Sequence, residues 1–188
     1  MASKKGKLIL IAGPSGVGKK TLIGELIKDS SLNLMFSISC TTRKKRTEEQ
    51  DGIDYFFISK EEFQRKIDNG QMLEYAHFFD NYYGTPKEWV EEKLSQGINI
   101  LLEIETEGFN QIVEKYPDVV SIFILPTSLS ELERRLRNRG TEDDHDISMR
   151  LKKAEKEIIE ASNFKYQVVN DDIQKAVNEL KKIITSEL

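Results

Sequence analysis

The stretch LILIAGPSGVGK at residues 8–19 decides the fold of this chain of 188 residues. The five consecutive apolar residues from Leu8 to Ala12 are typical of a strand buried on both faces of a parallel sheet. A glycine-rich segment, Gly13 to Lys19, follows directly, and a helix is predicted to open at Lys19 or Lys20. The spacing Gly-x-x-x-x-Gly-Lys between a strand and a helix predicts a loop whose backbone N–H groups surround phosphates and whose lysine reaches the outer ones.

The position after the lysine departs from the usual form of this loop. A Ser or Thr that holds Mg²⁺ is normal there, but this chain has Lys20, and Thr21 comes one residue later. Either Thr21 supplies the hydroxyl from a shifted position, or Mg²⁺ is held chiefly by phosphates and water. With Mg²⁺ as the cofactor, the residues expected to hold a nucleoside triphosphate here are Gly13, Pro14, Ser15, Gly16, Val17, Gly18, Lys19, Lys20 and Thr21.

Beyond the loop, short β-branched runs alternate with amphipathic stretches, a pattern typical of an α/β fold. Further buried strands are expected at residues 35–38, 100–104, 119–125 and 166–169. Helix starts are expected where Ser or Thr precedes Glu by three positions, at Ser59, Thr85 and Ser128, and Pro86 suits a first helical position.

Two segments interrupt this alternation. Residues 43–83 are rich in charged and aromatic residues, with strands expected at 54–58 and 72–79, and they indicate a small mixed lobe inserted after the second core strand. Four arginines at positions 134, 135, 137 and 139, followed by Gly140 and an acidic run, indicate two helices joined at a hinge, as in a mobile lid. The expected organisation is one domain over residues 5–186, with a core at 5–36, 86–127 and 158–188, a lobe at about 37–85 and a lid at about 128–157.

Composition excludes several classes of protein. The 28 Lys and Arg against 32 Asp and Glu give a formal charge of -4, which argues against a nucleic-acid binder that relies on overall basic charge. No run approaches the roughly 18 apolar residues of a membrane helix. The N-terminal MASKKGK lacks the apolar stretch and cleavage site of a signal peptide. We therefore expect a cytoplasmic protein without membrane or nucleic-acid partners; a monomer and a homodimer both stay open.

Two arginines and several aromatic residues in the inserted lobe point to a second substrate. Arg43 and Arg46 lie three positions apart just past a strand end, and planar guanidinium groups can bind a phosphate in bidentate fashion. A solvated basic loop is the ordinary alternative for such a charge run, and the tyrosines could be core residues. Their occurrence together with Glu74 and the pair Gly84-Thr85 in one short lobe favours a substrate site.

At this point the chain resembles the guanylate kinase family, in order, from about residue 7 to its C-terminus. The resemblance is carried by residues 13–21, Ser39-x-x-Thr42-Arg43-x-x-Arg46, Asp51-Gly52-x-Asp54-Tyr55-x-Phe57, Leu73-Glu74-Tyr75-Ala76, Asn81-Tyr82-Tyr83-Gly84-Thr85, Leu102-Glu103-Ile104, Arg137-x-Arg139-Gly140-Thr141 and Val169-Asn170-Asp171-Asp172. It implies a three-layer P-loop fold, and transfer of the γ-phosphoryl group of Mg-ATP to GMP, giving ADP and GDP, in purine nucleotide metabolism.

The resemblance also implies roles for single residues. Arg43, Arg46, Tyr55 and Tyr83 would bind the GMP phosphate; Glu74 and Glu105 would accept from guanine donors, with hydroxyls from Ser39 and Thr85. Lys19, Arg43, Arg139 and Arg150 would be catalytic, Arg135 and Arg139 would close over ATP, and Asn170 would border the adenine pocket. Glu105 stands where aspartate is usual, and Lys45, Thr47 and Glu48 replace prolines and a glycine, which bears on affinity for GMP.

Two other functions compete with this one. A guanylate-kinase-like protein-binding module without catalysis typically has a damaged phosphate loop, whereas the glycines and Lys19 are intact here. Another nucleoside-monophosphate kinase, or a kinase with a small non-nucleotide acceptor, is the enzymatic alternative. The pair Glu74 and Glu105 argues against adenine as the acceptor base, and the paired tyrosines argue for an acceptor that carries a phosphate.

Overall fold

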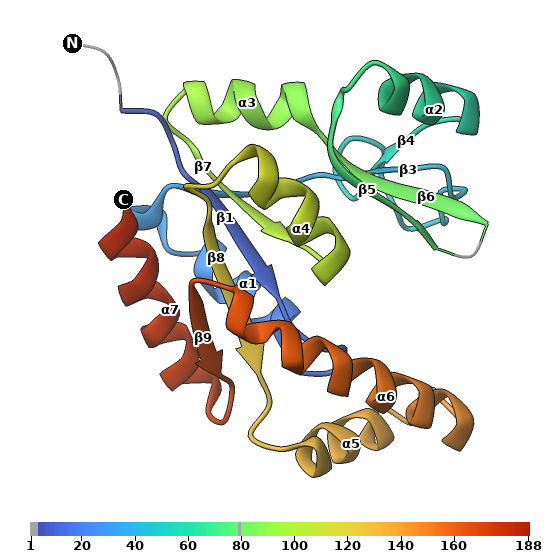
Figure 1. Cartoon of the computed structure of the whole chain (residues 1–188), viewed down its shortest axis with the longest axis vertical. Helices are drawn as coiled ribbons and strands as arrows, with labels where there is room; N and C mark the ends of the chain where they lie inside the picture. Colours follow the sequence, from blue (N-terminus) through green and yellow to red (C-terminus); the bar gives the residue numbers. More distant parts are fainter. Residues whose placement is uncertain (1–3, 79) are drawn as a thin grey trace.

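A five-stranded parallel sheet forms the core of the structure, a computed structural model that describes residues 4–78 and 80–188. The central strand is β1 (Leu8–Ala12), every residue of which is buried. On one side lie β7 (Asn99–Glu103) and then β2 (Leu34–Phe36); on the other lie β8 (Val120–Leu125) and then β9 (Tyr166–Val169). All five predicted core strands are present, to within three residues at either end, and all pair in parallel (Figure 1).

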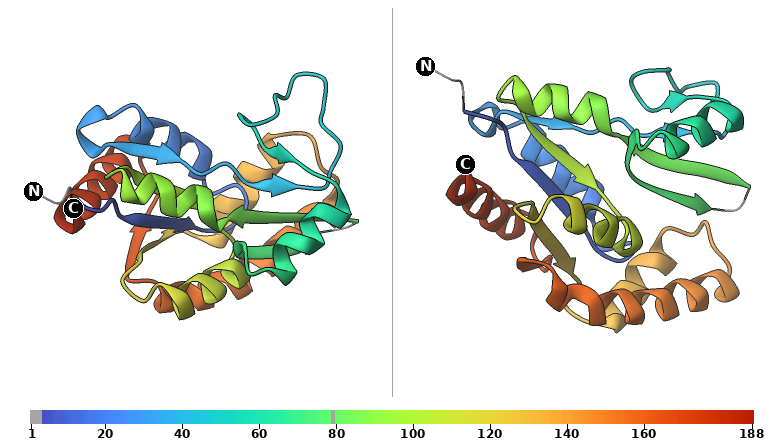
Figure 2. Two further views of the ribbon diagram at one scale, coloured as in Figure 1. Left: turned by 90° about the horizontal axis from the view of Figure 1, so that it is seen from above. Right: turned by 45° about the horizontal axis from the view of Figure 1, so that its top comes forward.

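Helices cover both faces of this sheet, as predicted for a three-layer α/β fold. Alternate residues of β1 point to opposite faces. Ile9 and Ile11 pack with α1 (Lys19–Ile27) and α7 (Ile173–Glu187), whereas Leu8, Leu10 and Ala12 pack with α3 (Lys87–Ser95) and α4 (Thr106–Lys115). Figure 2 shows helices on either side of β1. Because β1 is apolar on both faces, it suits an interior position in such a sheet, between β7 and β8.

The inserted lobe contains a second, mixed sheet of four strands in the order β4-β3-β6-β5. These are β3 (Cys40–Thr41), β4 (Phe56–Phe57), β5 (Met72–Phe78) and β6 (Asn81–Pro86), and α2 (Lys60–Asp68) packs against them through Phe63. The strand expected at 54–58 is therefore shorter than predicted. The strand expected at 72–79 ends at Phe78 in the described part, since residue 79 lies outside the described residues.

Two of the three predicted helix caps are confirmed. The hydroxyls of Ser59 and Ser128 accept from the backbone N–H three residues on, at the starts of α2 and of α5 (Leu129–Asn138). The prediction at Thr85 was wrong, because β6 continues through Pro86, which is the N-cap of α3 rather than its first residue. The Thr85 hydroxyl donates instead to the carboxylate of Glu74 on the neighbouring strand.

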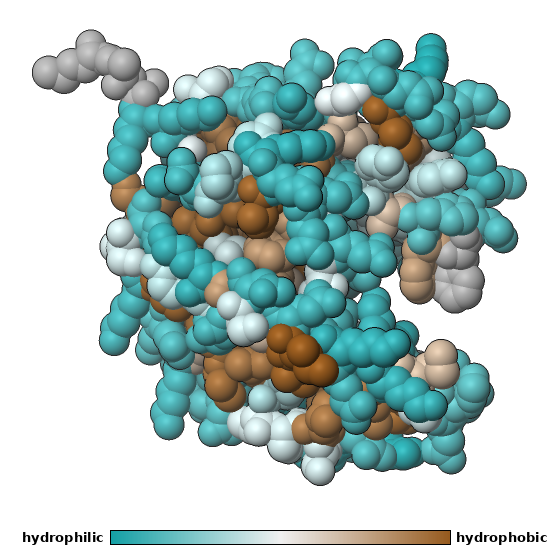
Figure 3. Space-filling view, in the orientation of Figure 1, coloured by the Kyte–Doolittle hydropathy of each residue, from teal (hydrophilic) through white to brown (hydrophobic). Residues whose placement is uncertain are grey.

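The predicted lid consists of α5 and α6 (Asp144–Glu160), which lie side by side at the end of the molecule opposite the lobe (Figure 1). Gly140, with φ +65°, follows the end of α5. Short 3₁₀ turns at Ser30–Leu32 and Ala161–Asn163 precede β2 and β9. Figure 3 shows the surface hollowed between lobe and lid. Within the described ranges, no helix has the length and apolar character needed to cross a membrane.

The packing of α4 on the sheet predicts a large contrast between two isoleucines. Ile112 on α4 is 0% exposed, and Ile159 on α6 is 77% exposed. Ile112→Ala should lower the free energy of unfolding by about 2–5 kcal/mol because it leaves a cavity. Ile159→Ala, the same change on another helix, should stay within about 0.5 kcal/mol of the parent. Urea denaturation measures both; equal losses would contradict the assignment of α4 to the core.

Candidate active site

The phosphate loop leaves β1 and turns sharply into α1. Its last glycine, Gly18, is the N-cap of α1 with φ +98°, and a Cβ there would lie 2.7 Å from Nδ2 of Asn170. Only glycine accommodates both this φ and this close approach. The carbonyl of Val17 accepts from Nδ2 of Asn170 at 2.8 Å and from Nη1 of Arg135 at 3.2 Å. These two hydrogen bonds fix the position of the loop. The first backbone N–H groups of α1 are available to bind an anion.

Lys19 lies across this loop. Its ammonium donates to the carbonyls of Gly13 and, at 3.2 Å, of Pro14, and it lies 3.9 Å from a carboxylate oxygen of Glu103. The side chain is only 13% exposed. Burial lowers the pKa of Lys19 below its ordinary value, and the Glu103 carboxylate opposes that shift. The Lys19 ammonium is therefore largely shielded from water. It interacts strongly with any anion that reaches it.

Glu103 also lies beside the loop, although no role is predicted for it from the sequence. It ends β7 and pairs in register with Ile11 of β1, next to the start of the loop. A carboxylate at the C-terminal end of a strand beside a phosphate loop is the available signal. Thr21 and Lys20 both lie exposed on α1. No group of three or more His, Cys, Asp or Glu that could hold a metal ion occurs in residues 4–78 and 80–188.

In the lobe, Arg43 is the centre of a second cationic site. Its guanidinium donates to the carboxylate of Glu49 through Nη2 at 2.7 Å and Nη1 at 3.1 Å. The rings of Tyr55 and Phe57 lie 5.4 and 5.8 Å from the guanidinium carbon, and the side chains of Tyr55 and Tyr83 interact with it. Three of the four predicted phosphate-binding residues, Arg43, Tyr55 and Tyr83, are therefore together.

Two predicted guanine-binding carboxylates lie near each other. Glu74 on β5 accepts from the Thr85 hydroxyl at 2.6 Å, and burial raises its pKa above the ordinary value although that hydrogen bond opposes the rise. A Cβ on Gly108 would lie 2.9 Å from Oε2 of Glu74, so the glycine in α4 makes room for this side chain. Glu105 is the N-cap of α4, and its negative charge contributes to the raised pKa of Glu74.

The lid contacts both sides of the hollow. Arg150 on α6 donates to the Ser15 hydroxyl of the phosphate loop at 2.7 Å, and it pairs with Glu142 at 2.7 Å. Lys153, one turn along the same helix, lies 2.9 Å from a carboxylate oxygen of Glu105. Arg135 on α5 also donates to the Asn170 carbonyl at 3.1 Å. The lid is thus joined by side chains to the phosphate loop and to the N-cap of α4.

Three predicted residues lie apart from these contacts. Arg139 caps α5 at its C-terminal end and is exposed, and among the described residues its guanidinium forms no hydrogen bond or ion pair. The side chain of Arg46 is exposed, and its backbone N–H donates to the Glu49 carboxylate at 2.9 Å. Ser39 is half-buried before β3, where its carbonyl accepts from the backbone of Phe56.

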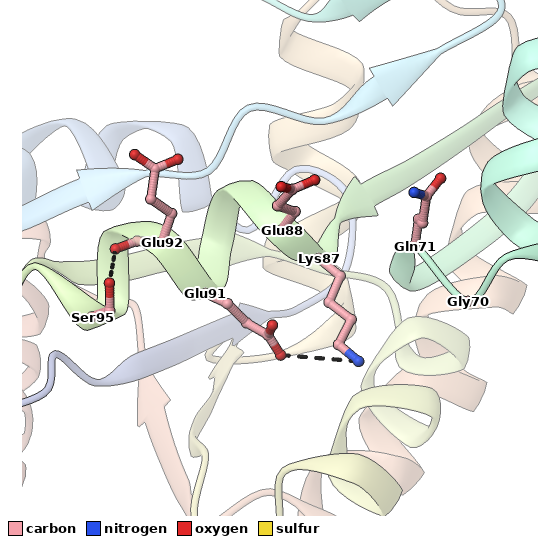
Figure 4. A pocket seen from close by; sticks show the side chains of 7 residues that line it. All are labelled: Gly70, Gln71, Lys87, Glu88, Glu91, Glu92 and Ser95. Carbon is pink, nitrogen blue, oxygen red and sulfur yellow. Dashed lines mark hydrogen bonds and ion pairs between the residues drawn. The ribbon is translucent and has the colours of Figure 1, made fainter.

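A separate hollow of about 380 Å³ runs along the outer side of α3, between that helix and the start of β5. Figure 4 shows its lining, in which Lys87 and Glu91 lean toward each other while Glu88 and Glu92 point away from them. None of the predicted site residues lines it. This hollow is therefore not the candidate site, which lies between lobe and lid.

Two glycine substitutions, one at the end of the phosphate loop and one inside α1, should have opposite effects on the free energy of unfolding. Gly18→Ala places a side chain at φ +98° against Asn170 and should lower the free energy of unfolding by about 1–3 kcal/mol and weaken nucleotide binding. Gly24→Ala in α1 meets nothing within 4 Å and should raise that free energy by about 1 kcal/mol. Thermal unfolding and titration with ATP test both. Intact ATP binding by the Gly18 variant would show that the loop does not need this turn.

Comparison with known proteins agrees with this geometry. The family model described as "Guanylate kinase" matches residues 5–187. The guanylate kinase of Latilactobacillus sakei is 50% identical over 185 residues, which cover 98% of this chain and 91% of that protein. The guanylate kinase of Mycoplasma mycoides is 48% identical over 96% of this chain, which spans only 61% of that longer relative.

Among solved structures, the crystal structure of guanylate kinase from Anaplasma phagocytophilum superimposes with a TM-score of 0.76. The identity is 34%, and the match covers 100% of this chain and 88% of that one. Both the three-layer fold and the resemblance based on the motifs are confirmed. The chain belongs to the guanylate kinase family.

Proposed function

We propose that this chain transfers the γ-phosphoryl group of ATP to GMP and releases ADP and GDP. The proposal rests on two cationic sites, the loop with Lys19 in the core and the cluster around Arg43 in the lobe. The lid contacts the donor side through Arg150 and the acceptor side through Lys153. An enzyme of phosphoryl transfer mainly positions two substrates and stabilises the charge on the moving group.

On the donor side, the N–H groups at the start of α1 and the Lys19 ammonium would hold the phosphates of ATP. Phosphate oxygens would replace the Gly13 and Pro14 carbonyls as partners of the lysine, which exchanges neutral acceptors for charged ones. When bound with ATP, Mg²⁺ would supply positive charge that offsets the negative charge of the phosphates. Glu103 and Thr21 supply the oxygen donors that fit this ion, since Mg²⁺ is usually held by one or two protein oxygens together with phosphates and water.

On the acceptor side, Arg43, Arg46, Tyr55 and Tyr83 would hold the GMP phosphate. Guanine has an acceptor at O6, a donor at N2 and a further donor at N1 beside it. The carboxylates of Glu74 and Glu105 would accept from these donors, and hydroxyls of Ser39 and Thr85 would complete the set. Adenine would leave these groups unpaired, and a site built on hydrogen bonds can reject such an analogue by about 10⁴-fold.

The lid would stabilise the transferring group and exclude water, which competes as an acceptor. Arg150 already donates to Ser15 of the loop; Arg135 would close over ATP from the lid, and Asn170 would border the adenine. Arg139 would have to move inward from its exposed position for a catalytic role. We further propose that the chain acts on free nucleotides in purine metabolism in the cytoplasm, as a monomer or homodimer, without nucleic-acid or membrane partners.

The acceptor panel tests the proposed reaction. ADP release from Mg-ATP should be fast with GMP and about 10⁴-fold less efficient with AMP. Lys19→Ala should lower kcat with GMP by about 100-fold or more, because it removes a preorganised cation from the moving charge. Lys28→Ala, at the exposed far end of α1, is the matched control and should leave turnover unchanged.

The same panel separates the alternatives. Silence with every acceptor, in a protein that binds a partner peptide, would favour the protein-binding module. Comparable rates with AMP and GMP would overturn the carboxylate account of guanine selection. Turnover with a small acceptor that lacks a phosphate would contradict the role given to Arg43 and the tyrosines.

The raised pKa of Glu74 predicts how GMP binding depends on pH. Only the ionised carboxylate can accept from two guanine donors, so affinity for GMP should fall as pH falls through the raised pKa of Glu74, by up to about tenfold per pH unit. In the free protein the sign is opposite: the raised pKa stabilises the folded chain below it, and that contribution is lost as pH rises through it. Glu74→Gln should bind GMP weakly and lose this dependence. Calorimetric titration with GMP across a pH series measures the affinity of the parent chain and of Glu74→Gln.

The phosphate of GMP also titrates, and the comparison with Glu74→Gln removes that shared contribution. An unchanged pH profile in the Gln variant would show that another group controls binding.

A further inference from the structure

A carboxylate of the chain itself occupies one edge of the guanidinium proposed to bind the acceptor phosphate. The two oxygens of Glu49 accept from Nη2 and Nη1 of Arg43, the geometry with which an arginine also binds a phosphate. The side chains of Arg43 and Glu49 are only 18% and 17% exposed. This ion pair is therefore well shielded compared with an ordinary surface pair.

The N–H groups of Arg43 can be accounted for singly. A guanidinium has five N–H donors. Glu49 uses one on Nη1 and one on Nη2, and the Lys44 carbonyl takes the second on Nη1 at 2.9 Å. Glu49 and Lys44 do not use the Nε–H and one Nη2–H, which lie on the other edge of the same plane. The side chains of Tyr55 and Tyr83 also interact with this guanidinium, and the proposed function assigns all three residues to the acceptor phosphate.

Glu49 also fastens the loop that carries both arginines. One of its carboxylate oxygens accepts from the backbone N–H of Arg46 at 2.9 Å, and its own carbonyl accepts from Nζ of Lys45 at 3.0 Å. Residues 44–48 are exposed and contain no proline, so the loop has little else to restrict its backbone. The Arg43 guanidinium holds the pKa of Glu49 down to about 2, so the carboxylate stays charged at any working pH.

We propose that Glu49 is a positioning residue for the acceptor phosphate: it grips one edge of Arg43 and closes the loop, so that the other edge faces the substrate together with Tyr55 and Tyr83. This inference deepens the proposed function and rests on it. A guanidinium held on one edge loses little further conformational freedom when it binds a phosphate on the other, and such preorganisation raises affinity.

The competing arrangement is a carboxylate that blocks the phosphate site and must leave before GMP binds. The two predict opposite signs when the charge of Glu49 is removed. Positioning predicts weaker binding of GMP, whereas blocking predicts tighter binding. The sign of one binding change therefore decides between them.

The experiment compares Glu49→Gln with Glu48→Gln, the neighbouring exposed glutamate in the same loop, which makes an identical change in net charge. Calorimetric titration with GMP and with guanosine, and steady-state kinetics for ATP, give the readouts. We expect Glu49→Gln to weaken GMP binding about tenfold or more while affinity for guanosine and KM for ATP stay unchanged. Glu49→Asp retains the charge and should recover part of the loss; Glu48→Gln should resemble the parent.

Each other outcome overturns the inference. Tighter GMP binding in Glu49→Gln would mean that the carboxylate competes with the phosphate. A Glu49→Gln variant indistinguishable from Glu48→Gln would mean that the ion pair does not position Arg43. Equal losses for GMP, guanosine and ATP would mean a general loss of folding. If the parent chain itself bound no GMP, the proposed function would fail, and the inference with it; failure in the variants alone concerns Glu49 only.

Discussion

The hydrogen bonds that converge on the carbonyl of Val17 hold the phosphate loop against the core sheet and the lid. That carbonyl belongs to the phosphate loop, yet its partners are Asn170, which follows β9, and Arg135, which lies on lid helix α5. Arg135 in turn donates to the Asn170 carbonyl. Loop, core sheet and lid therefore meet at one oxygen, and the glycine at position 18 leaves the space that Asn170 needs. Without this junction, the α1 N-terminus would not be presented to a phosphate in a defined direction.

Charged groups of the core, the lobe and the lid interact in ion pairs. Lys19 and Arg43 are both partly dehydrated cations, and each interacts with a carboxylate of the chain, Glu103 or Glu49. Lys153 reaches from the lid to Glu105, a pair exposed enough that it contributes little stability but is easily exchanged. Substrates bring new anions and new donors to these same groups. Binding of substrates can therefore redistribute the ion pair between the lid and the N-cap of α4 without breaking the buried core.

Much of the fold could be predicted because its determinants are local. The apolar run at residues 8–12 and the glycines after it specify a buried strand and a phosphate loop without reference to other segments. Pairings between distant segments could not be predicted by spacing. The Thr85 hydroxyl matches a helix cap in sequence, but Glu74, on the adjacent strand, is its actual partner. For the same reason Glu103 lacked a role, since only the register of β7 beside β1 brings it to Lys19.

Equilibrium binding of a single molecule that spans both sites shows whether one hollow holds ATP and GMP with their phosphates facing each other. A suitable molecule is adenosine and guanosine joined by a chain of five phosphates, one more than ATP and GMP carry together, and its diadenosine counterpart is the control. The account predicts that the mixed compound binds about 100-fold or more tightly than ATP alone, and that the diadenosine compound gains far less. A mixed compound that binds no better than ATP would contradict the account, because the two sites would then not face each other at the distance that transfer requires.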